Sequence, residues 1–388
     1  MKKLISLCLL GSLLLGACSE PRSDYTPKLT REDLQTSLEL GTEFLLANQK
    51  TAGNFNYSYD FVNKQLSEDD NQVRQAGALW GLTLLYSHEP STEVEKAISK
   101  GLDFYGSSSI PSYPGEEKGS TGSLALLTLS LLDYLSVDTA PNHDTYEELL
   151  KIWLGSLIKL QNEDKEFYGK YDYLTGEGSG TSSPYSDGEA LLALSKAANY
   201  FNSDEYFALA NEALDAMWTD HVEKAQEETL DSDETKGFYQ WCTMSLYELD
   251  KYQRSKGEMD TQYVDKALEL AYWMVDTHKV LERSRNTAYA FEGLISAYKL
   301  ADLHNEDEDY NSDLDMLMET IDVGLYRLTS WQVGHPLQNN FITNNAQEEG
   351  LERGGITNAA NESDLRIDVT QHQMHAVTMA LEWVYSQD

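Results

Sequence analysis

Apolar residues recur along most of this chain with the three- and four-residue spacing of amphipathic helices. These stretches come in pairs, and a loop rich in Gly, Tyr, Ser and Asp interrupts each pair. The six predicted pairs are 31–48 with 71–87, 93–105 with 121–135, 146–161 with 187–201, 205–224 with 238–252, 263–278 with 285–304, and 314–330 with 369–385. The pattern predicts an all-α protein of six helical hairpins and twelve helices.

The second stretch of each pair is more apolar than the first. Residues 76–82 read Ala-Gly-Ala-Leu-Trp-Gly-Leu, whereas residues 93–100 carry Glu93, Glu95 and Lys96. Helices that are apolar all round are buried on all sides, and amphipathic helices keep one face in water. We therefore expect the second helices to form the inner wall and the first helices the outer wall of a closed ring, an (α/α)6 toroid spanning 31–388.

Residues 49–55, Gln-Lys-Thr-Ala-Gly-Asn-Phe, resemble a helix-end motif that is common in α/α toroids. Such toroids include sugar epimerases, six-hairpin glycosidases, polysaccharide lyases, terpene cyclases and lanthionine cyclases. The resemblance implies the toroid fold and a site at the mouth where the inner-helix N-termini converge. It does not fix the chemistry. The zinc site of lanthionine cyclases needs a second cysteine besides Cys242, and the acidic run 231–234 departs from the triterpene cyclase motif.

The loops expected at this mouth carry most of the unusual residues. Tyr and Trp offer flat apolar faces with a polar tip, which suits a sugar ring, although aromatic residues also pack loops over a core. The candidate substrate-binding residues are Tyr57, Tyr59, Asp60, Arg74, Tyr171, Tyr185, Trp241, Arg283, Arg285, Asn286 and Tyr289. A carbohydrate ligand is the expected partner of this mouth.

Five titratable residues near the predicted inner-helix starts are the candidate catalytic groups: Asp187, Glu189, Glu292, Asp368 and His372. Two carboxyl groups facing each other across the ring would serve as acid and base or nucleophile in glycoside cleavage. Asp368 with His372 would serve as an orienting pair or a base. Asp187 has an alternative role as a helix cap, and Glu189 as a first-turn acid that favours the helix dipole.

We expect no cofactor and no metal ion. His372 and His375 lie three residues apart, but histidines satisfied by protein groups are commoner than metal pairs. The acidic run 307–315 has EF-hand-like spacing without the required Gly and final Glu. The sequence contains no phosphate-binding glycine loop, nucleophile elbow or HExxH motif.

The chain is strongly acidic. Its 29 Lys and Arg and 65 Asp and Glu give a formal charge of −36. This field repels nucleic acid and long polyanionic glycans, so neither is expected as a long-range partner, although a locally basic pocket would override it.

The amino terminus has the features of an export signal. Lys2 and Lys3 precede an apolar stretch, 4–15, that is too short to span a bilayer. Residues 15–18, Leu-Gly-Ala-Cys, resemble the lipobox of bacterial lipoproteins, which implies cleavage of 1–17 and a lipid on Cys18. The alternative is an ordinary signal with an incidental cysteine. The lipid reading implies residues 18–30 as a tether, membrane attachment through the lipid, and an envelope location; Ser19 in place of Asp favours the outer membrane.

Two functions follow as hypotheses. The first is a carbohydrate-active envelope enzyme of hydrolase, lyase or epimerase type, which predicts titratable groups with perturbed pKa values converging in one pocket. The second is a non-catalytic lipoprotein that binds a glycan or an envelope protein partner, which predicts aromatic and amide groups without such a set.

Overall fold

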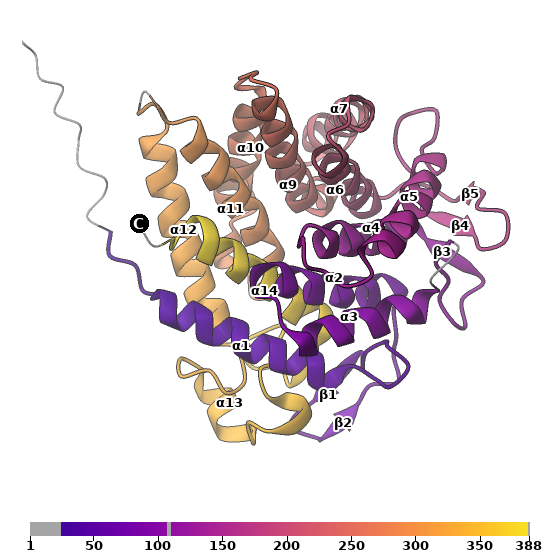
Figure 1. Cartoon of the computed structure of the whole chain (residues 1–388). Coiled ribbons are helices and arrows are strands. Elements are labelled where there is room, and N and C mark those ends of the chain that lie inside the picture. The colour runs from indigo at the N-terminus through magenta and orange to yellow at the C-terminus, as the bar shows by residue number, and fades with distance from the viewer. Residues whose placement is uncertain (1–24, 107–109, 307, 387–388) are drawn as a thin grey trace, which may run out of the picture.

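The computed structural model describes residues 25–106, 110–306 and 308–386. Twelve helices of at least 11 residues form a ring in this part of the chain (Figure 1). The inner helices are α2 (Gln72–His88), α4 (Thr121–Leu135), α6 (Pro184–Phe201), α9 (Asp233–Ser255), α11 (Ala288–Leu303) and α14 (Ile367–Trp383). The outer helices are α1 (Arg31–Asn48), α3 (Thr92–Tyr105), α5 (His143–Lys159), α7 (Asp204–Trp218), α10 (Gln262–Tyr272) and α12 (Asn311–Thr329). The predicted all-α toroid is confirmed.

The inner helices close the ring. Each inner helix contacts the next one along the chain, and α14 contacts α2. The outer helix α1 packs against α14, so the first and last helices, indigo and yellow in Figure 1, lie side by side. The closed arrangement therefore joins the two ends of the described chain.

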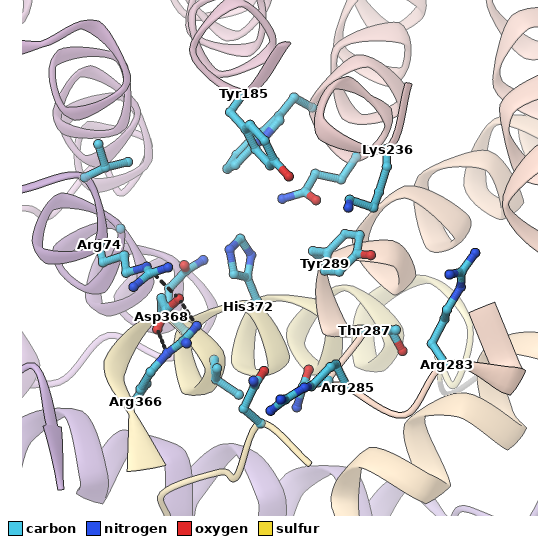
Figure 2. Close-up of a pocket in the computed structure, with 18 of the residues that line it drawn as sticks. Arg74, Tyr185, Lys236, Arg283, Arg285, Thr287, Tyr289, Arg366, Asp368 and His372 are labelled. Atoms are coloured by element: carbon cyan, nitrogen blue, oxygen red, sulfur yellow. Dashed lines mark hydrogen bonds and ion pairs between the residues drawn. The ribbon is translucent and has the colours of Figure 1, made fainter. Parts of the chain in front are cut away.

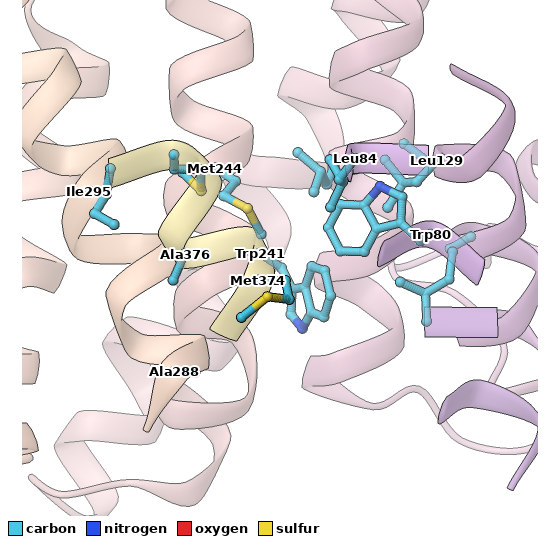
Figure 3. Packing of buried hydrophobic residues seen from close by; sticks show 14 of the residues in the cluster. Trp80, Leu84, Leu129, Trp241, Met244, Ala288, Ile295, Met374 and Ala376 are labelled. Carbon is cyan, nitrogen blue, oxygen red and sulfur yellow. The ribbon is translucent and has the colours of Figure 1, made fainter. Parts of the chain in front are cut away.

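Burial separates the two walls as the hydrophobic pattern predicts. Every residue of α4 is buried, whereas α3 buries a single stripe of residues at helical spacing. Trp80 of α2 and Trp241 of α9 pack against each other inside the toroid, and the centroids of their indole rings are 5.7 Å apart (Figure 3). The Trp80 indole N–H donates to Asp133 at 2.7 Å, which satisfies the polar atom of this buried ring.

Three outer helices end in the same way. The side-chain amides of Gln49, Gln161 and Gln332 donate to the carbonyl oxygens of Gly53, Lys165 and Gly354 at 3.0, 3.1 and 3.1 Å. The same glutamines form isolated antiparallel bridges to Phe55, Phe167 and Ile356. The helix-end motif seen at 49–55 is thus one copy of an internal repeat.

The repeat also anchors the following inner helix. The backbone N–H groups of Phe55, Phe167 and Ile356 donate to Gln75 Oε1, Asp187 Oδ1 and Thr370 Oγ1 at 2.7, 2.9 and 3.2 Å. Each acceptor is the fourth residue of its inner helix. This position therefore ties each mouth loop to the inner wall.

Two small antiparallel sheets fix the mouth loops. One has the order β2 (Gln65–Leu66), β1 (Ser58–Asp60), β6 (Asp364–Arg366), and the other has β3 (Lys118–Ser120), β4 (Lys170–Asp172), β5 (Gly178–Ser179). Strand β6 leads directly into α14 and β3 into α4. The sheets therefore hold the starts of these inner helices.

Several element boundaries differ from the prediction. The predicted helix 205–224 ends in a π-helical turn (Thr219–Lys224), and α8 (Ala225–Glu228) continues it where a loop from 225 was expected. Helix α9 begins at Asp233 instead of 238, because the Ser232 hydroxyl accepts the N–H of Glu234. The remaining elements are a π-helical turn (Trp273–Thr277), α13 (Asn340–Asn345) and 3-10 turns at Val280–Glu282 and Gly350–Glu352.

The end of the predicted tether is bound to the ring. The backbone N–H groups of Lys28 and Leu29 donate to Asp322 of α12 at 2.8 and 3.0 Å, and the Tyr25 hydroxyl also binds Asp322. These bonds hold Tyr25, Lys28 and Leu29 against α12. The signal peptide, Cys18 and the rest of the tether lie outside the described residues. No helix in the described ranges has the length and apolarity needed to cross a membrane.

Candidate active site

A cavity of about 630 Å³ lies where the inner helices begin. It is lined by residues near the starts of these helices, such as Arg74 and Gly77 of α2 and Tyr185 and Glu189 of α6. Positions three or four apart lie on one helix face, so the first turns present these side chains inward. The cavity occupies the mouth that the fold predicted.

Ten of the predicted site residues line this cavity. They are Arg74, Tyr185, Glu189, Trp241, Arg283, Arg285, Asn286, Tyr289, Asp368 and His372. Figure 2 shows His372 between two groups of side chains. One group is Arg74, Arg366 and Asp368, and the other is Lys236, Tyr289 and Arg283.

Asp368 is held between two arginines. Arg366 makes a bidentate pair with it, at 3.0 and 2.8 Å, and Arg74 Nε lies 3.1 Å from Oδ2. Burial raises the pKa of Asp368, but the two guanidinium groups outweigh burial and hold its pKa below the ordinary value. Asp368 therefore stays ionised, and the hydrogen bond of His372 is to Glu292 instead.

Arg74 reaches Asp368 because it does not pair within its own helix start. Asn71 caps α2, since its side chain accepts the N–H groups of Val73 and Arg74 at 3.1 Å. Asp70 instead accepts from Gln75 and from the Tyr113 hydroxyl.

Glu189 is almost fully buried in the cavity wall, with 4% of its surface exposed. No donor among the described side chains forms a hydrogen bond with it. Burial, and to a smaller extent the negative charge of Asp187, raises its pKa to about 8. Gly122 of α4 makes room for this side chain, because a Cβ there would lie 2.2 Å from Glu189 Oε2. Glu189 is therefore protonated at neutral pH.

Glu292 connects two histidines of α14. Its Oε1 lies 3.0 Å from His372 Nδ1 and 3.2 Å from His375 Nδ1, and Glu292 itself is fully buried behind the cavity. Burial lowers the pKa of His372, but the Glu292 carboxylate outweighs this and raises it. Glu292 thus orients His372 through Nδ1 and leaves Nε2 for a ligand.

Asp187 does not line the cavity. It is fully buried, accepts from the Phe167 N–H, and lies 2.9 Å from His221 Nε2. Burial lowers the pKa of His221, but Asp187 outweighs this and raises it. Asp187 occupies the loop-anchoring position of the internal repeat, so the structure places it in a buried hydrogen-bond network outside the cavity.

Glu166, Asp187 and His221 are the group in the described ranges whose possible metal-ligand atoms all lie within 4.8 Å of one another. Two of the three are already joined by the hydrogen bond just described. The group lies outside the cavity, where it holds the loop before α6 to the π-helical turn.

Four expected binding residues lie elsewhere. The Tyr57 hydroxyl accepts a hydrogen bond from Arg74, and Tyr57 does not line the cavity. Tyr59 pairs with Leu365 in the β1–β6 ladder. Asp60 accepts the N–H groups of Val62 and Asn63 in a turn. Tyr171 is buried and donates to the carbonyl of Pro111. These aromatic residues pack the mouth loops, the alternative that the sequence left open.

Several lining residues were not predicted, namely Lys236, Gln240, His278, Gln371 and Arg366. Lys236 lies in the first turn of α9, where the sequence predicted a loop, and Gln240 precedes the predicted Trp241. Gln371 follows the predicted Asp368 by three residues, a spacing that signals a shared face. The indole N–H of Trp241 and the amide N–H of Gln371 are buried and find no acceptor among the described residues. Both are donors available to a ligand.

No protein-family profile matches the chain, and no curated protein matches its sequence. Solved structures do share its fold. A GH76 α-mannanase from Bacteroides thetaiotaomicron superposes with a TM-score of 0.58 at 14% identity, over 89% of this chain and 95% of its own. Cellobiose 2-epimerase from Bacillus thermoamylovorans gives 0.59 at 10% identity, over 89% and 98%. An unsaturated glucuronyl hydrolase specific for heparin gives 0.58 at 12% identity, over 90% and 97%.

The chain therefore has the six-hairpin α/α toroid fold shared by these hydrolases and epimerases. Its cavity brings together a protonated carboxyl group, an ionised carboxylate, an oriented histidine and aromatic faces. This set can transfer protons to and from a bound ligand.

Proposed function

We propose that this chain is a carbohydrate-active enzyme that cleaves a glycosidic bond at the ring mouth, with Glu189 as the general acid and Asp368 as the ionised carboxylate. The observation that carries the proposal is the opposite tuning of two carboxyl groups that line one cavity. Burial raises the pKa of Glu189 to about 8, while two arginines hold the pKa of Asp368 below its ordinary value. Carboxyl groups whose pKa values are pushed apart divide acid and base roles between them.

The chemistry follows from these protonation states. Glu189 donates its proton to the leaving-group oxygen as the bond to the anomeric carbon breaks. The Asp368 carboxylate accepts a proton from the attacking water. His372 Nε2 binds a sugar hydroxyl, and the faces of Trp241 and Tyr185 pack against the ring.

The fold neighbours support a sugar ligand. An inactive α-1,6-mannanase from Salegentibacter sp. with 11% identity and a TM-score of 0.58 holds α-1,6-mannotriose. Neighbours of such low identity show only a shared architecture. The support for a sugar ligand therefore comes mainly from the residues that line this chain's own cavity.

Two alternatives have an observation of their own. The oriented pair of His372 and Glu292 favours proton transfer at a sugar carbon, as a lyase or an epimerase needs. The unpaired N–H donors of Trp241 and Gln371 favour a protein that binds a glycan without catalysing a reaction on it.

Product analysis distinguishes these functions. Purified protein is incubated with a panel of oligosaccharides, and products are identified by mass spectrometry and NMR. A new reducing end with uptake of water supports hydrolysis, an unsaturated product supports a lyase, and an inverted carbon supports an epimerase. Loss of turnover in E189Q and D368N, with normal turnover in E248Q, supports the assigned roles. Glu248 is a suitable control because it is a buried glutamate outside this cavity. Binding without turnover on the whole panel would leave the non-catalytic alternative.

We also propose that the mature protein is an envelope lipoprotein anchored through Cys18, with the outer membrane as its expected location. The support is the run Leu-Gly-Ala-Cys at 15–18 after a short apolar stretch. Metabolic labelling with a palmitate analogue tests this: label on the wild type and none on C18S supports the anchor. An unlabelled wild type contradicts it.

A further inference from the structure

The cavity is basic although the chain is acidic. Five of the 29 Lys and Arg residues line it, against two acidic side chains, Glu189 and Asp368. The five are Arg74, Lys236, Arg283, Arg285 and Arg366. Because the whole chain carries a formal charge of −36, this clustering is opposite in sign to its surroundings.

One group of these cations keeps an excess of positive charge. Arg74 and Arg366 share the single carboxylate of Asp368, so two positive charges face one negative charge. Glu189 does not balance them, because burial keeps its proton in place at neutral pH. This wall of the cavity therefore carries a net positive charge.

The other group exchanges partners easily. Lys236, Arg283 and Arg285 pair with Asp233, Asp231 and Glu362, whose side chains are 94, 43 and 37% exposed and do not line the cavity. Exposed ion pairs contribute little, because water solvates both partners well when they separate. These cations can therefore turn to an anionic group that enters the cavity and is shielded from water.

We infer that the saccharide bound here carries an acidic group, the carboxylate of a uronic acid or the chemically similar sulfate ester, and that Lys236, Arg283 and Arg285 form its subsite. This inference rests on the proposed function, since it names the class of sugar that enters the same cavity. The acidic surface outside the mouth does not prevent binding, because the cavity focuses the field of its own lining at short range.

Matched sugars test the inference. The full chain in a detergent without sugar groups is titrated with glucose, glucuronic acid and glucose 6-sulfate, and with galactose and galacturonic acid. The members of each set differ only at carbon 6. We expect the acidic member to bind at least about tenfold more tightly at low salt, as a charge-assisted hydrogen bond provides, and this preference to shrink as salt rises. Glucuronic acid against glucose 6-sulfate shows which anion is preferred.

The variant K236Q/R285Q is expected to lose most of this preference. It spares Arg283, whose Nε donates to the carbonyl of His278 and supports the loop. R353Q is the matched control, because Arg353 makes a similar exposed ion pair with Glu43 and does not line the cavity. R285K keeps the positive charge and is expected to retain the preference. This control shows whether the effect of K236Q/R285Q comes from the lost charge or from a change in structure.

Equal or tighter binding of the neutral sugars would overturn the inference and leave the proposed function in place. An unchanged preference in K236Q/R285Q would overturn the assigned subsite. If neutral and acidic sugars all fail to bind at millimolar concentration, the inference and the proposed carbohydrate function fail together.

Discussion

The unusual state of Glu189 arises from its immediate neighbours. The side chain lies against Gly122, which offers space but no hydrogen bond, and Asp187 lies two residues earlier as an additional negative charge. A buried carboxyl group without a donor is more stable protonated than ionised. An acid that holds its proton above neutral pH is the form that leaving-group protonation requires.

This environment predicts a pH-dependent stability. The pKa of Glu189 is about 8 in the folded chain and near its ordinary 4.5 when unfolded, so folding is favoured by the bound proton. Its contribution to the free energy of unfolding is complete below about pH 4.5 and is lost as the pH rises to about 8. E189Q does not titrate and so avoids this loss. Since one pKa unit is about 1.4 kcal/mol, its free energy of unfolding at pH 8 is expected to exceed that of the wild type by on the order of a few kcal/mol.

Urea denaturation at pH 5 and pH 8 measures this difference. The stability advantage of E189Q over the wild type should be larger at pH 8 than at pH 5. An advantage that is the same at both pH values would show that Glu189 titrates normally.

Asp187 and Glu189 lie two residues apart, but their substitutions are predicted to have opposite effects: one lowers stability and the other lowers turnover. D187A leaves the Phe167 N–H and His221 without their acceptor, so a loss of about 1–3 kcal/mol per unsatisfied group is expected in the free energy of unfolding. At a temperature where D187A is folded, its kcat should stay near that of the wild type. E189Q should instead lower kcat by about 10²–10⁴-fold without loss of stability. A catalytic defect in folded D187A would contradict the structural role.

At the scale of elements, the repeated end of the outer helices organises the mouth. Three glutamines at helix ends hold three loops, and the fourth residue of the next inner helix anchors each loop. The copies differ in detail: Gly53 has a φ of 110° in the first, whereas Lys165 has a φ of 70° in the second. The positive φ is therefore retained in both copies although glycine is replaced by lysine in the second.

Gly53 is predicted to be irreplaceable. An alanine Cβ there would lie 2.2 Å from the Lys100 carbonyl oxygen and would occupy a positive φ, so G53A should cost more than about 1 kcal/mol in the free energy of unfolding. G155A is the matched control. Gly155 lies inside α5 with no atom within 4 Å of a built Cβ, so alanine should gain about 0.5–1 kcal/mol. Thermal denaturation of both variants checks the opposite signs, and equal shifts would contradict the proposed geometry.

The sequence predicted the hairpins well because helical periodicity is a local property. It placed ten site residues at the mouth for the same reason, since helix starts and loop positions follow from the periodic pattern. The pairing of His372 with Glu292 was not predictable, because it depends on how α14 packs against α11 across 80 positions of sequence. The role of Asp187 did leave a signal, since Gln161 and Phe167 repeat the spacing of Gln49 and Phe55.

At the scale of the whole molecule, ring closure and charge distribution act together. The contact of α14 with α2 and α1 brings Asp368 and His372 opposite Arg74, so the last helix completes the cavity. The acidic exterior disfavours long polyanions, while the basic mouth accepts a single acidic group. With a lipid on Cys18, the proposed anchor, this mouth would stay near a membrane and its glycans.

The pH dependence of turnover tests the central claim most directly. If Glu189 is the general acid, kcat/KM on a cleaved saccharide must fall as the pH rises through about 8, because the group loses the proton it donates. The residual activity of E189Q should lack this limb, while E248Q should retain it. A wild-type profile that stays flat through this range, or an identical limb in E189Q, would contradict the assignment of Glu189.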